Sequence, residues 1–152
     1  MTRPILLDTN APLWILGGDP KPSKRVKTAV LSPLSDIRVS VVNAWEIVLK
    51  FQAGKFSFDV PIERVLSEVL SGATWPVVAV RPEHITGLLE LPPTHRDPFD
   101  RLLIAQARAE GMMLATPDSQ TAVRGLHDLV RARKPPHPPR YTAVECALWC
   151  SR

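Results

Sequence analysis

Short apolar runs alternate along the chain with longer stretches in which apolar residues recur every three or four positions. The short runs are typical of buried β-strands, and the periodic stretches are typical of amphipathic helices. The sequence predicts strands at residues 4–7, 36–42, 75–80 and 112–115, with a further short strand at 127–130. It predicts helices at residues 10–16, 23–30, 43–53, 61–72, 81–91 and 98–110.

Strand and helix patterns follow one another in turn, which predicts an α/β domain with a mainly parallel sheet covered on both faces. The length of 152 residues fits one domain, and we assign residues 1–130 to it. Residues 131–152 differ, because the stretch "RARKPPHPPR" is basic and rich in proline and cannot form a helix or a central strand. We expect a basic, proline-rich C-terminal extension of unknown role.

The net charge of +4 belongs to that extension. Residues 131–152 contain five basic residues and one acidic residue, whereas residues 1–130 contain 14 of each. The charge is therefore weak evidence for a polyanionic partner. Two cysteines are too few for a disulfide framework, and no apolar run approaches the roughly 18 residues of a membrane span. The N-terminal "MTRPILLDTN" does not resemble a secretory signal, so we expect a cytoplasmic protein without a membrane partner.

Five acidic residues stand where the predicted strands end or the following helices begin, and open α/β sheets build their sites at the carboxyl ends of strands. Asp8 directly follows the first strand, and Asp118 comes three residues after the strand at the end of the core pattern. Glu46 lies in the first turn of the helix that follows the second strand. Asp97 and Asp100 begin the helix that precedes the last core strand. If the first and last core strands are neighbours, these acids face one crevice.

Each acid also has a purely structural explanation. Asp8 and Asp118 fit helix caps or turn residues, and Glu46 fits a surface acid stabilised by the helix dipole. Asp97 has the strongest such explanation, since aspartate before a proline at the first helical position is a good helix start. Asp100 would complete a capping-box-like pair, but it lies on the side of the helix that must face the sheet, where a carboxylate needs a positive partner. We therefore assign Asp97 mainly to capping and Asp100 mainly to chemistry.

Clustered carboxylates repel one another unless a cation neutralises them, so the pattern predicts a divalent metal ion. Ligands that are all hard oxygens favour Mg²⁺ or Mn²⁺ over zinc, and the histidines show no metal-ligand spacing. Such a site suits metal-assisted hydrolysis of a phosphodiester. Neighbouring polar residues are predicted to position water, phosphate or the nucleic-acid backbone: Thr9, Asn10, Asn43, Thr116, Ser119, Arg96 and Arg101.

Four motifs in order closely resemble those of the PIN-domain ribonucleases, specifically the VapC-type toxins of type II toxin–antitoxin (VapBC) pairs. They are "ILLDTN", "SVVNAWEIVLKFQAGK", "HRDPFDRLLIAQA" and "LATPD", and the resemblance covers residues 4–130. It implies a three-layer α/β/α sandwich, Mg²⁺- or Mn²⁺-dependent endoribonuclease activity, a homodimer, and inhibition by a small VapB-like antitoxin. It places the metal-binding and catalytic acids at Asp8, Glu46, Asp100 and Asp118, with Asp97 at the rim.

The sequence departs from the family pattern in two places. Many relatives have histidine where this chain has Asn10, which puts substrate placement in doubt. The stretch "SQTAVRGLHDLV" lacks the usual aromatic residues, which puts the last strand in doubt. A binding module that has lost turnover therefore stays open as an alternative, and a DNA nuclease is a lesser one. A haloacid-dehalogenase-type phosphatase would need an acid at position 10, and the chain contains neither a Walker loop nor a G-x-G-x-x-G motif.

Overall fold

The computed structural model describes residues 3–15, 28, 30, 32–92 and 97–115. Its centre is a parallel sheet of four short strands in the order β3-β2-β1-β4. The strands are β1 (Ile5–Leu7), β2 (Ile37–Ser40), β3 (Val77–Val78) and β4 (Met113–Ala115). The predicted mainly parallel sheet is confirmed, and the first strand pairs with the last core strand, which is the condition under which the acids were predicted to face one crevice.

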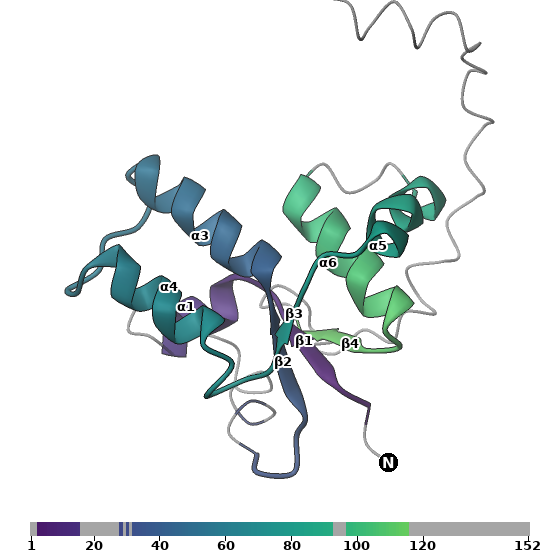
Figure 1. Ribbon diagram of the computed structural model, residues 1–152, viewed down its shortest axis with the longest axis horizontal. Coiled ribbons are helices and arrows are strands. Elements are labelled where there is room, and N and C mark those ends of the chain that lie inside the picture. Colours follow the sequence, from purple (N-terminus) through teal and green to yellow (C-terminus); the bar gives the residue numbers. More distant parts are fainter. Residues whose placement is uncertain (1–2, 16–27, 29, 31, 93–96, 116–152) are drawn as a thin grey trace, which may run out of the picture.

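Helices cover both faces of this sheet. They are α1 (Asn10–Ile15), α3 (Val41–Gln52), α4 (Ile62–Leu70), α5 (Pro82–Gly87), the 3₁₀ helix η1 (Leu88–Glu90) and α6 (Pro98–Ala109). Figure 1 shows α1, α3 and α4 on one side of the strands and α5 and α6 on the other. This is the predicted α/β/α arrangement. The C-terminal extension lies outside the described residues.

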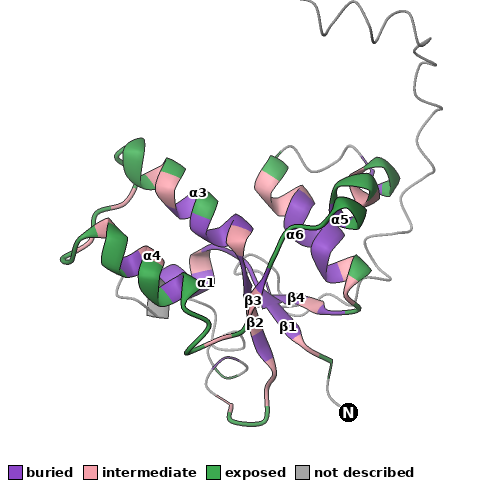
Figure 2. Cartoon of the chain, viewed as in Figure 1, coloured by how far each residue is buried: buried purple, intermediate pink, exposed green. Residues whose placement is uncertain are grey.

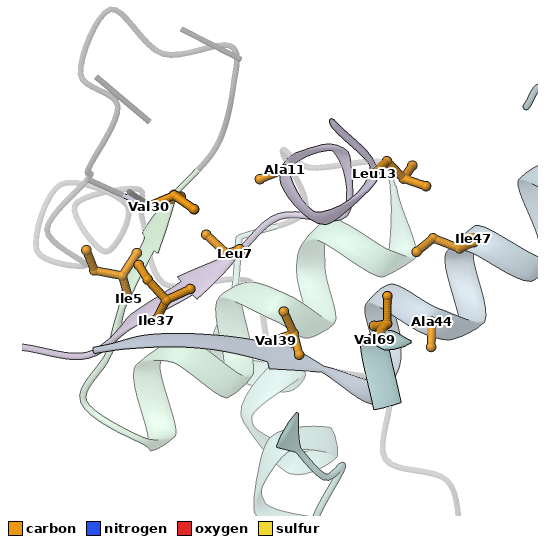
Figure 3. Close-up of a cluster of buried hydrophobic side chains, with 11 residues drawn as sticks. Ile5, Leu7, Ala11, Leu13, Val30, Ile37, Val39, Ala44, Ile47 and Val69 are labelled. Atoms are coloured by element: carbon orange, nitrogen blue, oxygen red, sulfur yellow. The ribbon is translucent and has the colours of Figure 1, made fainter. Parts of the chain in front are cut away.

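The core consists of two apolar clusters, one on each face of the sheet, because successive side chains of a strand point to opposite faces. Ile5 and Leu7 of β1 pack with α1, α3 and α4, as the close-up in Figure 3 shows. Leu6, between them, belongs to the second cluster, beneath α6. The strands are buried, whereas the outer faces of the helices are exposed (Figure 2). The centre of the sheet is thus a rigid base for side chains at its edge.

The boundary between β2 and α3 differs from the prediction of a strand to residue 42 and a helix from residue 43. The helix begins at Val41, because Ser40 caps it. The Ser40 hydroxyl accepts from the Val42 N–H at 3.0 Å, and Asn43 Oδ1 accepts from the Ser40 N–H at 2.7 Å. This reciprocal capping box stabilises the helix start. Glu46 therefore lies in the second turn of α3, and its predicted place in the first turn was wrong.

Two further element boundaries differ from the prediction because a proline stands beside them. The predicted strand 75–80 is reduced to Val77–Val78, since Pro76 has no N–H and serves only as the acceptor for the Val39 N–H. The predicted helix 81–91 ends in the 3₁₀ turn η1, and Leu91, which precedes a proline, is extended. Most of the predicted helix 23–30 and all of the predicted strand 127–130 lie outside the described residues.

Candidate active site

The candidate site lies at the carboxyl end of β1, the strand that pairs with β2 on one side and β4 on the other. Chain connections diverge at this point, and such switch points form crevices in open α/β sheets. A backbone hydrogen bond extends the pairing of β1 with β4 by one residue, because the Asp8 N–H donates to the Ala115 carbonyl at 3.0 Å. Asp8 is thereby fixed at the sheet edge between the ends of its two neighbouring strands.

The Asp8 carboxylate is buried, with 8% of the residue exposed. The pKa of Asp8 is raised to about 7; burial is the largest cause, the nearby charge of Asp100 is the next, and the charge of Glu46 adds less. A hydrogen bond from the Thr9 N–H to Asp8 Oδ1, at 2.6 Å, and the charge of Lys50 oppose this rise without cancelling it. The carboxylate thus lacks compensation for its charge, which is the condition that a bound cation relieves.

Glu46 is also buried, so a surface acid stabilised by the helix dipole does not describe it. Its Oε1 forms an ion pair with Lys50 Nζ at 2.5 Å, and its Oε2 accepts from the Thr9 hydroxyl. The Thr9 hydroxyl in turn accepts from Asn43 Nδ2 at 3.1 Å, and the same amide donates to the Leu7 carbonyl at 3.2 Å. This chain of bonds fixes α3 to the end of β1. Thr9 and Asn43 therefore hold the acids in place, and a contact of either with water or phosphate stays a prediction.

Asp97 and Asp100, at the start of α6, differ in their exposure and in their partners. Asp97 is exposed, and its Oδ1 accepts from the Phe99 N–H at 2.8 Å, which confirms the predicted cap. Asp100 is half-buried and close enough to Asp8 for its charge to raise the pKa of that carboxyl. The charges of Glu46 in α3 and Asp100 in α6 thus both raise the pKa of Asp8 at the end of β1.

Of the remaining predicted residues, the structure describes Arg101 and Asn10 and leaves the others out. Arg101 donates through Nη1 to the Pro92 carbonyl at 2.8 Å and through Nη2 to the Leu88 carbonyl at 3.2 Å, so its guanidinium joins α6 to η1 and Pro92. Asn10 begins α1 and is half-buried. The others lie outside the described residues: Arg96, Thr116, Asp118 and Ser119.

Two features of the site were absent from the sequence prediction. Lys50 was not singled out, although its spacing of four residues from Glu46 is the usual one for a helical ion pair. Trp45 packs edge-to-face on Phe99, with ring centroids 4.8 Å apart and an interplanar angle of 71°. This aromatic pair joins α3 to α6 beside Glu46 and Asp100, and Trp45 is 56% exposed.

The donor set fits a hard divalent cation, since the ligands that these residues offer are carboxylate oxygens. Within the described ranges, however, no three acidic, histidine or cysteine side chains form a group that could hold a metal ion as they stand. Glu46 already has Thr9 and Lys50 as partners, whereas the raised pKa of Asp8 marks it as an acid that a bound cation would stabilise. Asp118 comes three residues after β4 along the sequence and is a further predicted ligand.

None of the helices in the described part of the chain is both long and apolar enough to cross a membrane.

The fold is similar to three solved structures, each at a TM-score above 0.5. FitAB bound to a DNA fragment is 21% identical, with a TM-score of 0.55 over 75% of this chain and 85% of that one. FitAcB from Neisseria gonorrhoeae is 21% identical, with a TM-score of 0.54 over 78% and 88%. VapBC2 from Rickettsia felis, bound to a promoter DNA fragment, is 18% identical, with a TM-score of 0.52 over 74% and 86%.

At these identities the likeness shows a shared fold. No curated protein matches the sequence. The model of the PIN domain family matches residues 5–124, which include β1 with Asp8, all the described helices, and β4. Because that match spans most of the sequence, the chain belongs to the PIN domain family.

Proposed function

We propose that this chain is a Mg²⁺- or Mn²⁺-dependent endoribonuclease, the toxin of a toxin–antitoxin pair, which hydrolyses RNA phosphodiester bonds in the cytoplasm. The observation that carries the proposal is the convergence of Asp8, Glu46 and Asp100 at the carboxyl end of the central strand. A purely structural domain would gain no stability from three like charges that raise the pKa of a buried carboxyl. Membership of the PIN domain family supports a nuclease.

The residues of the site have distinct roles in this proposal. Asp8 and Asp100, with Asp118, would hold the cation, and the Thr9 N–H orients Asp8 by its bond to Oδ1. Glu46, Thr9 and Asn43 keep α3 at a fixed place beside Asp8. A bound divalent ion supplies positive charge to the phosphate and lowers the pKa of water. Asp8 and Glu46 are buried, and charges interact more strongly where bulk solvent is excluded.

Two partners belong to the proposal besides RNA. We propose a VapB-like antitoxin and a homodimer, on the basis of the sequence resemblance to VapC-type toxins. The similarity in fold to FitAB and VapBC2 supports this assignment. The rival is a binding module of the same fold without turnover, and its support is Glu46, whose two oxygens already have partners in the protein.

Cleavage of total cellular RNA by the purified full-length chain tests the proposal. We expect discrete fragments with Mg²⁺, none with EDTA, and a loss of at least about a hundredfold in rate for Asp8→Asn and Asp100→Asn, since each removes a charged ligand of the cation. Asp59→Asn, which changes an exposed acid in the loop before α4, is the matched control and should cleave at the wild-type rate.

Three results would count against the proposal. Folded protein that binds Mg²⁺ and RNA without cleaving would establish the binding module. Cleavage that persists in both site variants would show that other residues, or a contaminant, perform the reaction. Faster cleavage of single-stranded or duplex DNA than of RNA would identify a DNA nuclease.

A further inference from the structure

Lys50 is the cation that the described part of the chain brings to the acidic site. Its Nζ lies 2.5 Å from Glu46 Oε1, and its charge lowers the pKa of Asp8. The same ammonium lies over the Phe56 ring, 5.6 Å from the centroid. These contacts fix the end of a long side chain at the edge of a group of carboxylates.

The surroundings of Lys50 differ from those of Glu46. The Glu46 side chain is 6% exposed, whereas the Lys50 side chain is 27% exposed. The ion pair therefore joins a buried carboxylate to a side chain that is partly exposed. A ligand from solvent can reach the Lys50 side chain.

The other basic residues near the site do not share this position. The Arg101 guanidinium is bonded to the Pro92 and Leu88 carbonyls. Lys55 follows α3 and is exposed. The ion pairs of Arg38, Arg81 and Arg108 are with acids outside the site, whereas that of Lys50 is with Glu46.

We infer that Lys50 binds a phosphate of the substrate, and that its pairing with Glu46 neutralises this carboxylate until the substrate arrives. The inference rests on the proposed function. A divalent cation held by Asp8 and Asp100 would reduce the negative charge around Glu46 and so would weaken the attraction that holds Lys50. A phosphate oxygen then offers Lys50 a charge-assisted hydrogen bond at the surface of the site.

Binding of a single-stranded oligonucleotide, measured without turnover, tests this inference. The full-length chain is titrated into a fluorescent 2′-O-methyl RNA with Ca²⁺ in place of Mg²⁺, over a range of salt concentrations, and a gel checks that the RNA stays intact. We expect Lys50→Gln to weaken binding about tenfold. We also expect the slope of log K against log salt to fall by about 0.7, the value for one phosphate contact on a single strand.

Two variants serve as matched controls. Lys55→Gln removes the same charge five positions later and should keep the wild-type slope. Lys50→Arg keeps the charge and should bind within about threefold of the wild type. A wild-type slope for Lys50→Gln, or equal losses for Lys50→Gln and Lys55→Gln, would overturn the inference.

A double-mutant cycle with Glu46→Gln separates phosphate binding from simple neutralisation of Glu46. If Lys50 binds phosphate, Lys50→Gln should weaken RNA binding as much in the Glu46→Gln background as in the wild type. If Lys50 only neutralises Glu46, the effect should vanish in that background, which would overturn the inference. The cycle also covers the case in which Lys50→Gln alone fails to fold, because the double variant has no unpaired charge at this position.

The outcomes distinguish this inference from the proposed function. Failure of the wild-type chain to bind the oligonucleotide with any divalent cation would count against the nuclease proposal, and the inference would fall with it. Wild-type binding that Lys50→Gln leaves unchanged would reject the inference alone.

Discussion

The Ser40 hydroxyl donates a hydrogen bond to Gln106 Oε1 at 2.6 Å, across 66 positions of sequence. Both residues are fully buried, and Gln106 Nε2 also donates to the Ala79 carbonyl at 3.2 Å. Ser40 caps α3, which carries Glu46, and Gln106 belongs to α6, which carries Asp100. This bond therefore fixes the relative position of the two helices that supply acids to the site.

Replacing Gln106 by leucine should destabilise the protein by about 2–4 kcal/mol. The change keeps the side-chain volume but leaves the buried Ser40 hydroxyl without its acceptor, which costs about 1–3 kcal/mol, and removes the hydrogen bond to the partly buried Ala79 carbonyl, which contributes about 1 kcal/mol. Urea unfolding of the full chain measures the free energy. Gln52→Ala, on the exposed end of α3, should change it by less than about 0.5 kcal/mol. A loss below about 1 kcal/mol for Gln106→Leu would contradict the role of this bond.

Asp8→Asn should stabilise the metal-free protein at neutral and alkaline pH. The pKa of Asp8 is raised from 3.8 to about 7, so the native state binds this proton more tightly than the unfolded state does. The wild type should therefore lose stability as the pH rises from about 4 to about 7, by up to about 4 kcal/mol from this group. Asparagine carries no such charge, so the difference between the two proteins in urea unfolding should grow over the same range.

The same pair of proteins tests the metal. Mg²⁺ should raise the unfolding temperature of the wild type and leave that of Asp8→Asn nearly unchanged, since binding to the native state stabilises it. Asp59→Asn should respond to Mg²⁺ and to pH as the wild type does. An equal gain from Mg²⁺ in the Asp8→Asn variant would place the cation elsewhere.

His84 should make the protein less stable in mild acid. Its ring is fully buried; Nδ1 accepts from the Arg81 N–H at 3.1 Å, and Nε2 lies 2.9 Å from Glu110 Oε1, so the neutral ring donates through Nε2. Burial, and then the charge of Arg81, hold the pKa of His84 below its usual 6.5. The native state thus resists protonation, and stability that is complete above about pH 6.5 is lost as the pH falls through the lowered pKa.

NMR titration of the His84 ring and urea unfolding at several pH values measure this effect. The His84→Gln variant should lose less stability than the wild type between about pH 6.5 and pH 5, because glutamine does not titrate. A ring that takes up its proton above pH 6.5 would contradict the prediction.

Asp97 should contribute to stability through its cap alone. Asp97→Ala removes the acceptor of the Phe99 N–H and should cost about 1 kcal/mol. Asp97→Asn keeps an acceptor oxygen and should cost only a few tenths of a kcal/mol. Thermal unfolding compares the two. Equal losses would mean that the charge of Asp97, and not its hydrogen bond, matters to the fold.

The sheet, the two helical layers and the cap at Asp97 were predictable because they depend on periodicity and on short-range rules. The start of α3 was not, because Val41 and Val42 continue the β-branched pattern of β2, and the helix start there depends on the hydrogen bonds of Ser40 with Val42 and Asn43. The partnership of Glu46 with Thr9 was also hidden. It joins residues 37 positions apart, and the sequence does not show which polar atoms meet after packing.

The pairing of β1 with β4 has a consequence for the order in which a ribosome would complete this protein. Asp8 and Glu46 are translated early, but Asp100 and the partner strand that flanks Asp8 belong to residues 97–115. Pairing between such distant segments must wait until both have left the exit tunnel. A partly synthesised chain therefore holds an incomplete set of acids. The site can assemble in the cell only after nearly the whole domain has emerged from the ribosome.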